Sequence, residues 1–341
     1  MKNDENLNME FLKYNSIENT YREKETNHIL NYYPKEEFII QEKAHGSNFS
    51  MFFNGIDIKC AKRTDFILPD EQFNNYQNIV SRYSSNIQDL YKNKCEEGDI
   101  LVVYGEIIGG HYDHPEVPKK NDISKVQKGV QYSPDVEFYC FDIKINGEFL
   151  DMNETETLLK DHEFFYARTL FRGTFEECLK YPNDGQSKIS EWLGYPPLEE
   201  DNTLEGVVIK PVKPLYQNNG SRIIFKNKNE KFAEKTKVPK RPRKEVVPLK
   251  ESVQKLLDIA DEYINDNRLS NVVSKLGQVT QKDFGKVSGF FVKDIIEDMI
   301  KDGVDIDSLD KIDKKSFNKS LGKKSALFMQ TKFVNIIDGM L

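Results

Sequence analysis

A basic, proline-containing stretch at residues 235–250 constrains the fold more than any other feature, because it separates two parts with different patterns. The stretch reads KTKVPKRPRKEVVPLK, with three prolines and many cations, which is typical of an extended linker. Short strand-like runs lie before it, and helical stripes lie after it. A chain of 341 residues is also too long for most single cores. We therefore predict two domains, residues 1–245 and 246–341.

The first part reads as short strands with helices between them. Apolar or alternating runs predict strands, spacings of three and four predict helices, and Asn54-Gly55 is typical of a hairpin turn. Strands are predicted at 37–43, 48–53, 57–64, 99–108, 136–147, 204–212 and 221–229, and helices at 71–92, 155–165 and 174–182. There is no regular strand–helix–strand alternation, so an α+β fold with an antiparallel sheet is predicted.

The second part carries only helical patterns. Apolar residues form a stripe at helical spacing over 253–264, and the segments 292–303 and 326–338 repeat the pattern. An all-helical domain is predicted behind the linker.

The spacing of the cysteines and the hydropathy of the chain indicate the cellular compartment. The four cysteines, Cys60, Cys95, Cys140 and Cys178, are far apart in the sequence, which argues against a zinc site or a disulfide framework. No run is long enough to span a bilayer, and the acidic start has no apolar core of the kind a leader needs. We expect an intracellular protein of a reducing compartment, with no membrane partner.

The charge distribution is uneven. Net charge is −7, but residues 210–250 hold 13 Lys or Arg and three Glu, about +10, so the remainder carries about −17. Such a strip can be the electrostatic footprint of a nucleic acid or merely a solvated linker. Charge alone does not decide between these interpretations.

Polar clusters follow several predicted strands. Lys226 and Lys228 are two residues apart, so both lie on one face of their strand, where a phosphate would be a suitable anionic partner. Taken one at a time, each residue has a simpler interpretation as a turn residue or a surface ion-pair partner. The clusters are Lys43-His45-Gly46-Asn48, Lys62-Arg63, Glu106, and Glu205-Lys210 with Lys226-Lys228.

The order and wording of these clusters resemble motifs I, III, IIIa, IV and V of covalent nucleotidyltransferases. They are most similar to the RNA ligase 2 family, which includes phage-type RNA ligase 2 and the kinetoplastid RNA-editing ligases. The matching segments are EKAHGSNF, CAKRT, YGEIIGG, FYCFDI, LEGVVIKP and IFKNKNEKF, and the tail at 267–296 resembles the C-terminal domain of the family. The likeness covers roughly residues 11–300.

The resemblance implies an antiparallel-sheet nucleotidyltransferase (ATP-grasp-like) domain followed by a smaller all-helical domain that engages RNA ends. It implies an ATP-dependent RNA ligase that uses Mg²⁺ or Mn²⁺ in RNA repair or editing. A lysine attacks the α-phosphate of ATP, AMP moves to an RNA 5′-phosphate, and a 3′-OH displaces AMP. The attacking lysine must be neutral, whereas an ordinary lysine with a pKa of about 10.4 is protonated at pH 7; burial and nearby cations lower that value.

The resemblance also assigns roles to residues. It makes Lys43 the nucleophile, with Lys210 and Glu205 catalytic and Glu205 also serving the metal, partly through water. In the tail, Arg268 and Asp294 match positions that engage RNA ends, although an interdomain or intrahelical ion pair explains them equally well. The expected nucleotide contacts are Glu42, His45, Asn48, Arg63, Glu106, Phe141 (stacked on adenine), Lys226 and Lys228.

Three alternatives stay open at the level of sequence. A DNA ligase or a capping guanylyltransferase would usually carry an OB-fold after the last motif, whereas this tail reads as helical. A relative that binds RNA without catalysis would have no reason to keep the whole charged set.

The expected partner is RNA with 3′-OH and 5′-phosphate ends, in a nicked or bridged duplex, bound by a monomer. Segment 111–131, with its HYDH sequence, is interpreted as a substrate-facing loop, because two histidines alone make a weak metal motif.

Overall fold

A computed structural model describes residues 9–217, 220–233, 250–277, 279–280, 283–330, 332–333 and 336. The chain forms two compact units, Met1–Asn229 and Glu230–Leu341. The predicted domain boundary at residue 245 and all of the predicted linker except residue 250 lie outside the described residues.

The first unit contains two five-stranded sheets. One has the strand order β1-β10-β9-β2-β8 and the other β4-β3-β5-β6-β7. The strands are β1 (Glu18–Asn19), β2 (Glu37–Glu42), β3 (Ser47–Phe53), β4 (Ile58–Lys62), β5 (Leu101–His111), β6 (Ser133–Ile145), β7 (Glu148–Phe149), β8 (Thr169–Thr174), β9 (Gly206–Pro211) and β10 (Phe225–Lys228). The helices are α1 (Glu23–Tyr32), α2 (Tyr76–Lys94), α3 (Met152–Asp161), α4 (Phe175–Leu179) and α5 (Ile189–Trp192).

The pairing is antiparallel throughout the described sheets except between the short strands β1 and β10. The α+β prediction with an antiparallel sheet is confirmed. The Asn54-Gly55 hairpin is also confirmed, since β3 and β4 pair across it and Gly55 has a φ of +88°. Helix α2 begins at Tyr76 rather than at residue 71, because Asn74 and Asn75 take left-handed backbone angles that a helix does not allow. Neither α1 nor β8 was predicted.

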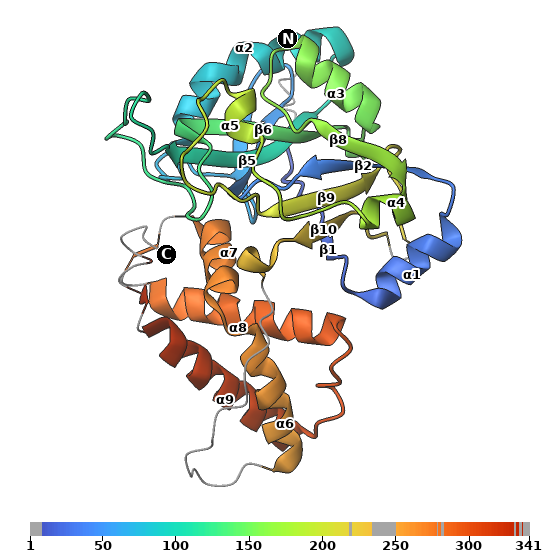
Figure 1. Cartoon of the computed structure of the whole chain (residues 1–341), viewed down its shortest axis with the longest axis vertical. Coiled ribbons are helices and arrows are strands. Elements are labelled where there is room, and N and C mark those ends of the chain that lie inside the picture. The colour runs from blue at the N-terminus through green and yellow to red at the C-terminus, as the bar shows by residue number, and fades with distance from the viewer. Residues whose placement is uncertain are drawn as a thin grey trace, which may run out of the picture. The chain divides into compact units, whose positions relative to one another are not determined.

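Helices cover one face of each sheet (Figure 1). Helix α2 packs on the β4-β3-β5-β6-β7 sheet through Ile79, Tyr83 and Ile87, which join Phe49 and Phe138 in one core. Helices α1 and α4 pack on the other sheet in a separate core that includes Ile29, Phe175 and Cys178. A third core joins the uncovered faces of the two sheets, because Phe52 and Tyr104 of one sheet share it with Val208 of the other. The sheets therefore face each other across a space that they line together.

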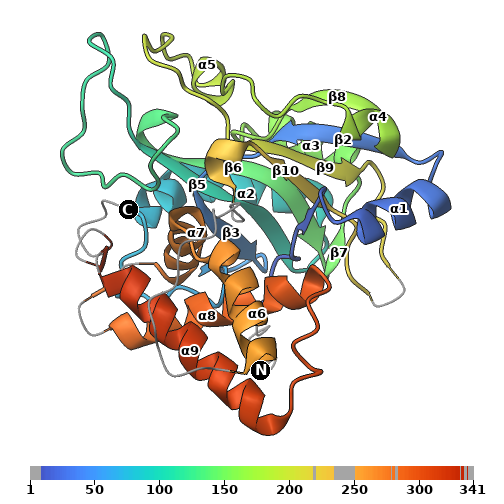
Figure 2. The ribbon, with the colours of Figure 1, turned by 60° about the horizontal axis from the view of Figure 1, so that its bottom comes forward.

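The second unit is helical in the part that the structure describes, as predicted. Its helices pack around one core in which Phe291, Ile295 and Phe317 are fully buried (Figure 2). Its elements are the 3-10 turns η1 (Glu230–Phe232) and η2 (Asp261–Tyr263) and the helices α6 (Glu251–Ala260), α7 (Asp266–Leu276), α8 (Phe284–Lys301) and α9 (Lys311–Gln330).

The four cysteines are all free thiols, and three of them are buried. None of the described helices combines the length and the apolar character that crossing a bilayer requires.

Candidate active site

Lys43 lies directly after β2, where this strand runs beside β9. Its backbone N–H donates to the carbonyl oxygen of Gly206 at 2.9 Å. The antiparallel register pairs Glu42 with Val207, which brings Lys43 next to the residue that precedes β9. That residue is Glu205, and its Oε2 lies 2.7 Å from Lys43 Nζ. The lysine side chain is 17% exposed, so its amine is held in place but remains accessible.

Glu205 is the buried centre of the cluster. Its Oε1 lies 2.9 Å from Lys228 Nζ, and its Oε2 lies 3.6 Å from His45 Nδ1 in addition to the contact with Lys43. Burial by itself raises the pKa of this carboxyl, but the ammonium groups of Lys228 and Lys43 outweigh burial and hold the pKa well below its usual range. Glu205 is therefore a fixed negative charge that positions cations, not a base that takes up protons near neutral pH.

Glu106 and Asn48 face each other across β3 and β5, in register. Burial raises the pKa of Glu106 to about 7; Lys43 and Arg63 oppose this shift, and Glu205 adds to it. Arg63 is half-buried and donates to the carbonyl oxygen of Asn15 from both terminal nitrogens at 3.4 Å. A half-protonated carboxyl at pH 7 can exchange a proton, and it lies within electrostatic reach of Lys43.

Gly46 is required by space at this position. A Cβ built there would lie 2.2 Å from the carbonyl oxygen of Ile107, so any side chain would push β5 away from the start of β3. The backbone of this segment is also fixed by Tyr132, whose hydroxyl accepts a 2.8 Å hydrogen bond from the N–H of His45.

Phe141 and Asp142 both reach the space between the sheets because β6 carries a bulge. Tyr104 pairs with Asp142 and Gly105 pairs with Cys140, which leaves Phe141 as the extra residue. Without the bulge, strand alternation would send the two side chains to opposite faces. Phe141 is partly exposed, and Lys210 Nζ of β9 lies 5.7 Å from the centre of its ring.

Lys210 is separate from the cluster around Glu205. It is 1% exposed, and its Nζ donates to the carbonyl oxygen of Phe141 at 2.6 Å and lies 3.2 Å from Asp142 Oδ1. Burial lowers the pKa of Lys210 to about 8, against the opposing charge of Asp142. Arg222 also binds Asp142 through two contacts of 2.9 Å, and it is 3% exposed. The basic strip predicted over 210–250 is therefore not one continuous surface, since two of its cations are buried and paired.

Lys226 and Lys228 lie on one face of β10, as predicted. The register places Lys226 opposite Val208 and Lys228 opposite Gly206, so both point away from the core that contains Phe225. The structure thus gathers Lys43, His45, Glu205 and Lys228 directly, with Glu106, Asn48 and Arg63 beside them and Phe141, Lys210 and Lys226 along the same inter-sheet space.

Glu42 does not join this group through its side chain. Its carboxylate accepts hydrogen bonds from Ser187 Oγ at 2.6 Å and from the N–H of Lys188 at 2.8 Å. Burial raises its pKa to about 7 despite these donors. In this arrangement Glu42 fixes the loop before α5, and the carboxylate is not available to a nucleotide.

Arg268 and Asp294 meet inside the helical unit. Arg268 is fully buried, donates to Asp294 through Nη1, and donates to Asp298 Oδ2 through Nη2 at 3.0 Å. Asp294 also lies 3.1 Å from Lys275 Nζ. The two residues do form an ion pair, but it joins α7 to α8 within the helical unit and is therefore neither interdomain nor intrahelical. A role at RNA ends stays a prediction, and Arg268 has no exposed surface with which to make a direct contact.

Sequence reasoning missed a network behind Phe141. Tyr14 donates to Asp142 Oδ2 at 2.5 Å, so Tyr14, Asp142, Arg222 and Lys210 form one buried group. Opposite charges hold the pKa of Asp142 at about 2 although burial alone would raise it. A signal was present, since Asp142 lies in the quoted FYCFDI segment. Its partners lie 128 and 80 residues away in sequence, which no local pattern reveals.

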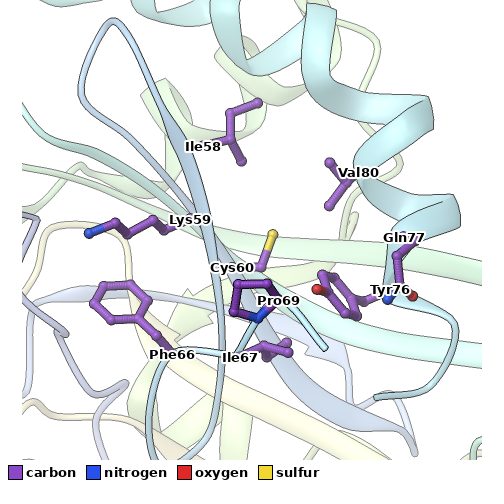
Figure 3. Close-up of a pocket in the computed structure, with 9 residues that line it drawn as sticks. All are labelled: Ile58, Lys59, Cys60, Phe66, Ile67, Pro69, Tyr76, Gln77 and Val80. Carbon is purple, nitrogen blue, oxygen red and sulfur yellow. The ribbon is translucent and has the colours of Figure 1, made fainter. Parts of the chain in front are cut away.

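A cavity of about 500 Å³ lies elsewhere, between β4 and the start of α2 (Figure 3). Its lining is mainly apolar, with Cys60, Phe66 and Tyr76 around it. None of the predicted site residues lines it, so we do not place the nucleotide there.

The HYDH segment shows no sign of a metal site. Within the described residues, no group of three or more His, Cys, Asp or Glu side chains is arranged to enclose a metal ion.

Comparison with protein families gives two matches in chain order. The profile of the RNA ligase family matches residues 36–228, and that of the T4 RNA ligase 2 C-terminal domain matches residues 247–326. The first match contains Lys43, Glu205 and Lys228, so it covers the whole cluster described above.

Two similar proteins come from Trypanosoma brucei brucei. Mitochondrial RNA-editing ligase 1 is 29% identical over an alignment of 345 residues, which covers 80% of this chain and 71% of that protein. Mitochondrial RNA-editing ligase 2 is 26% identical over 329 residues, covering 79% and 78%. A solved structure of a Naegleria gruberi RNA ligase variant with ATP and Mn aligns at 18% identity with a TM-score of 0.44. That alignment spans 66% of this chain and 58% of the solved one, and it is too distant to carry an argument about the site.

Proposed function

Since the chain belongs to the RNA ligase family, as the sequence resemblance predicted, we propose that it is an ATP-dependent enzyme that joins a 3′-OH end and a 5′-phosphate end of RNA. The observation that carries the proposal is the cluster at Lys43. A partly exposed amine lies 2.7 Å from a buried, permanently ionised carboxylate, at the edge of a space lined by an aromatic ring and further cations.

In the first step, Lys43 Nζ attacks the α-phosphorus of ATP. A phosphorus–nitrogen bond forms, the bond to pyrophosphate breaks, and Nζ loses its proton. Glu205 orients the amine, because the 2.7 Å contact restricts where Nζ can lie. Glu106, with its pKa of about 7, is the nearby carboxyl that can accept a proton at neutral pH. Lys226 and Lys228 stabilise the negative charge that develops on the phosphates.

In the later steps, an oxygen of the RNA 5′-phosphate attacks the phosphorus of lysyl-AMP and frees Lys43. The 3′-OH then attacks the 5′-phosphorus, and AMP leaves as the strand is sealed. Phe141 stacks on adenine, and its bulge position together with Lys210 beneath it fixes the ring. His45, Asn48 and Arg63 contact the ribose and the phosphates. Lys210 acts during formation of lysyl-AMP.

The family reaction uses a divalent cation, and the residues present fit one that is held mainly by substrate. No protein cage is available among the described residues. A Mg²⁺ or Mn²⁺ ion would be bound by ATP phosphates and waters, with the carboxylate of Glu205 contacting it directly or through water, which is how Mg²⁺ usually binds in nucleotide sites. When bound, it supplies neutralisation of phosphate charge.

The two units have separate tasks in this proposal. The residues assigned to AMP lie between Glu42 and Lys228, within the first unit. The helical unit engages the RNA ends. The biological substrate class is RNA in a nicked or bridged duplex, bound by a monomer.

The test is intact-mass spectrometry on the full chain after incubation with ATP and Mg²⁺, paired with sealing of nicked RNA and nicked DNA duplexes. An added mass of AMP and preferential sealing of RNA are expected. Absence of the adduct would overturn the proposal, and equal sealing of DNA would favour a DNA ligase. An adduct without sealing on any duplex would instead point to a capping-type nucleotidyltransferase.

A further inference from the structure

The connection between β5 and β6, residues 112–132, is long but firmly attached to the first unit (Figure 2). Ile123 is buried in the core beneath α2, and the N–H of Val126 donates to the carbonyl oxygen of Gly109 at 3.1 Å. Val130 is 3% exposed. The loop is therefore a fixed scaffold rather than a free tether.

The same loop is tied to the backbone that carries Lys43. The buried side-chain amide of Gln127 donates to the carbonyl oxygen of Gly46 at 3.4 Å. The hydroxyl of Tyr132 accepts the hydrogen bond from His45, as described above. Side chains next to Gln127 are therefore held close to the proposed reaction centre.

Four lysines lie on this loop, and two of them are already neutralised. Lys119 forms an ion pair with Asp113 at 2.9 Å, and Lys120 forms one with Asp135 at 2.5 Å. By contrast, Lys125 and Lys128 have neither an ion pair nor a side-chain hydrogen bond to any residue that the structure describes. Lys128 is exposed and Lys125 is partly exposed.

Lys125 lies beside a second ammonium group. Burial and then Lys128 lower the pKa of Lys125, and the carboxylate of Asp113, which is bound to Lys119, opposes them. His111 is also beside Lys125; burial and then Lys125 lower the pKa of this imidazole, so it is mainly uncharged at neutral pH. The backbone at Lys125 runs against Gly110, where an added Cβ would lie 3.0 Å from Lys125 Cα. We call Lys125 and Lys128 the loop cation cluster.

Two neighbouring ammonium groups favour binding of a further anion, because the nearby carboxylate of Asp113 is already bound to Lys119. We propose that the loop cation cluster binds the phosphodiester backbone of the RNA strand being joined, next to Lys43. This inference rests on the proposed function, and it adds a substrate-positioning surface on the first unit. The contacts go to phosphates, so they set the position of the RNA without reading its sequence.

The experiment compares the double variant Lys125→Gln, Lys128→Gln with the control Lys92→Gln, Lys180→Gln in the full chain. The control removes the same charge from the ends of α2 and α4, where these lysines are 73% and 70% exposed. Two quantities are measured on each: AMP adduct formation without RNA, and affinity for a nicked RNA duplex at several salt concentrations by fluorescence anisotropy.

The loop variant should form the adduct within about twofold of the parent. Its RNA affinity should fall roughly tenfold, and the slope of log affinity against log salt should decrease by about 1–2, as expected for loss of up to two phosphate contacts. The control should change RNA affinity less than about twofold.

Unchanged RNA affinity and salt slope in the loop variant would overturn this inference while leaving the proposed function in place. Equal weakening in the control would overturn it too, because overall charge would then explain the effect. Loss of the adduct in the loop variant alone would show that the cluster serves ATP rather than RNA. Absence of the adduct in the parent protein would instead refute the proposed function.

Discussion

Both units bury one charged side chain against two partners of opposite charge, yet the two clusters differ in which charge is buried and which stays accessible. In the first unit, buried Glu205 binds Lys43 and Lys228, and Lys43 keeps 17% exposure. In the helical unit, Arg268 is buried completely between Asp294 and Asp298, and its side chain is 0% exposed. The first cluster has a carboxylate at its centre and a reachable amine at its edge. The second has a fully buried cation at its centre and partly exposed carboxylates at its edge.

The difference shows that buried ion pairs do not by themselves mark a site. A planar guanidinium binds two carboxylates through its terminal nitrogens and joins two helices. A lysine at a strand end, held from one side only, keeps a face open to a substrate. Variants of both clusters test this difference between an accessible amine and a buried guanidinium.

Replacing the reachable amine should abolish the chemistry. Lys43→Ala removes the nucleophile, and Lys43→Arg keeps a positive charge that stays protonated and is a poor nucleophile. Neither variant should show an AMP adduct by intact-mass spectrometry. The matched control is Lys59→Ala on β4, which should form the adduct at the parental level. An adduct on either Lys43 variant would show that another residue is the nucleophile.

Removing Arg268, the central cation of the cluster in the helical unit, should unfold the protein rather than inactivate the protein that remains folded. Arg268→Met leaves Asp294 and Asp298 without their main partner, and breaking a buried pair costs about 3–5 kcal/mol in free energy of unfolding. Chemical denaturation followed by circular dichroism measures this cost. Lys275→Met removes the exposed partner of the same Asp294 and should cost no more than about 1 kcal/mol.

Sealing assays on the same two variants separate the interpretations of Arg268. If the pair is structural, AMP adduct formation on folded protein should persist in both. Parental stability of Arg268→Met combined with loss of RNA sealing would instead support a direct role at RNA ends.

Phe141→Ala should weaken ATP use by about 1–3 kcal/mol, roughly 5- to 150-fold, on the scale of base–aromatic stacking. Phe141→Tyr keeps the ring and should retain most activity. The measurement is the ATP concentration that gives half-maximal adduct, together with the melting temperature. If Phe141 were only core, alanine would cost about 3–5 kcal/mol of stability and leave ATP affinity unchanged.

Glu42 offers a third type of buried charge, one held by uncharged donors, and the smallest expected effect on activity, because it acts on the pH dependence of stability. Its pKa is about 7 when folded and about 4.3 in an unfolded chain, so between these values the folded state binds more protons. Stability contributed by this group is therefore full below about pH 4.3 and falls as pH rises to about 7. Glu42→Gln should flatten this part of the stability curve. Ser187→Ala removes a donor to the carboxylate and should extend the falling limb to higher pH. Parallel curves for parent and Glu42→Gln would contradict the assignment.

Much of this could be predicted from sequence because the relevant signals are local. The apolar run before Lys43, the period of two in Lys226 and Lys228, and the helical stripe at Val253 and Leu257 each depend on neighbouring residues. Strand and helix geometry alone then fixes which side chains share a face. The order of the charged motifs also indicated the protein family. These features also explain why the α+β part and the helical tail can be distinguished from the sequence alone.

Tertiary structure decided which charges meet and which remain accessible. Pairing of β2 with β9 brings Lys43 to Glu205, 162 residues away, and a bulge in β6 turns Phe141 and Asp142 to one side. Burial of Lys210 and Arg222 around Asp142, and of Arg268 between two helices, converted residues that read as basic surface or RNA contacts into internal ion pairs. A local pattern sets the direction of a side chain, but its partner comes from a distant segment, and only long-range packing determines the distance and exposure on which its chemistry depends.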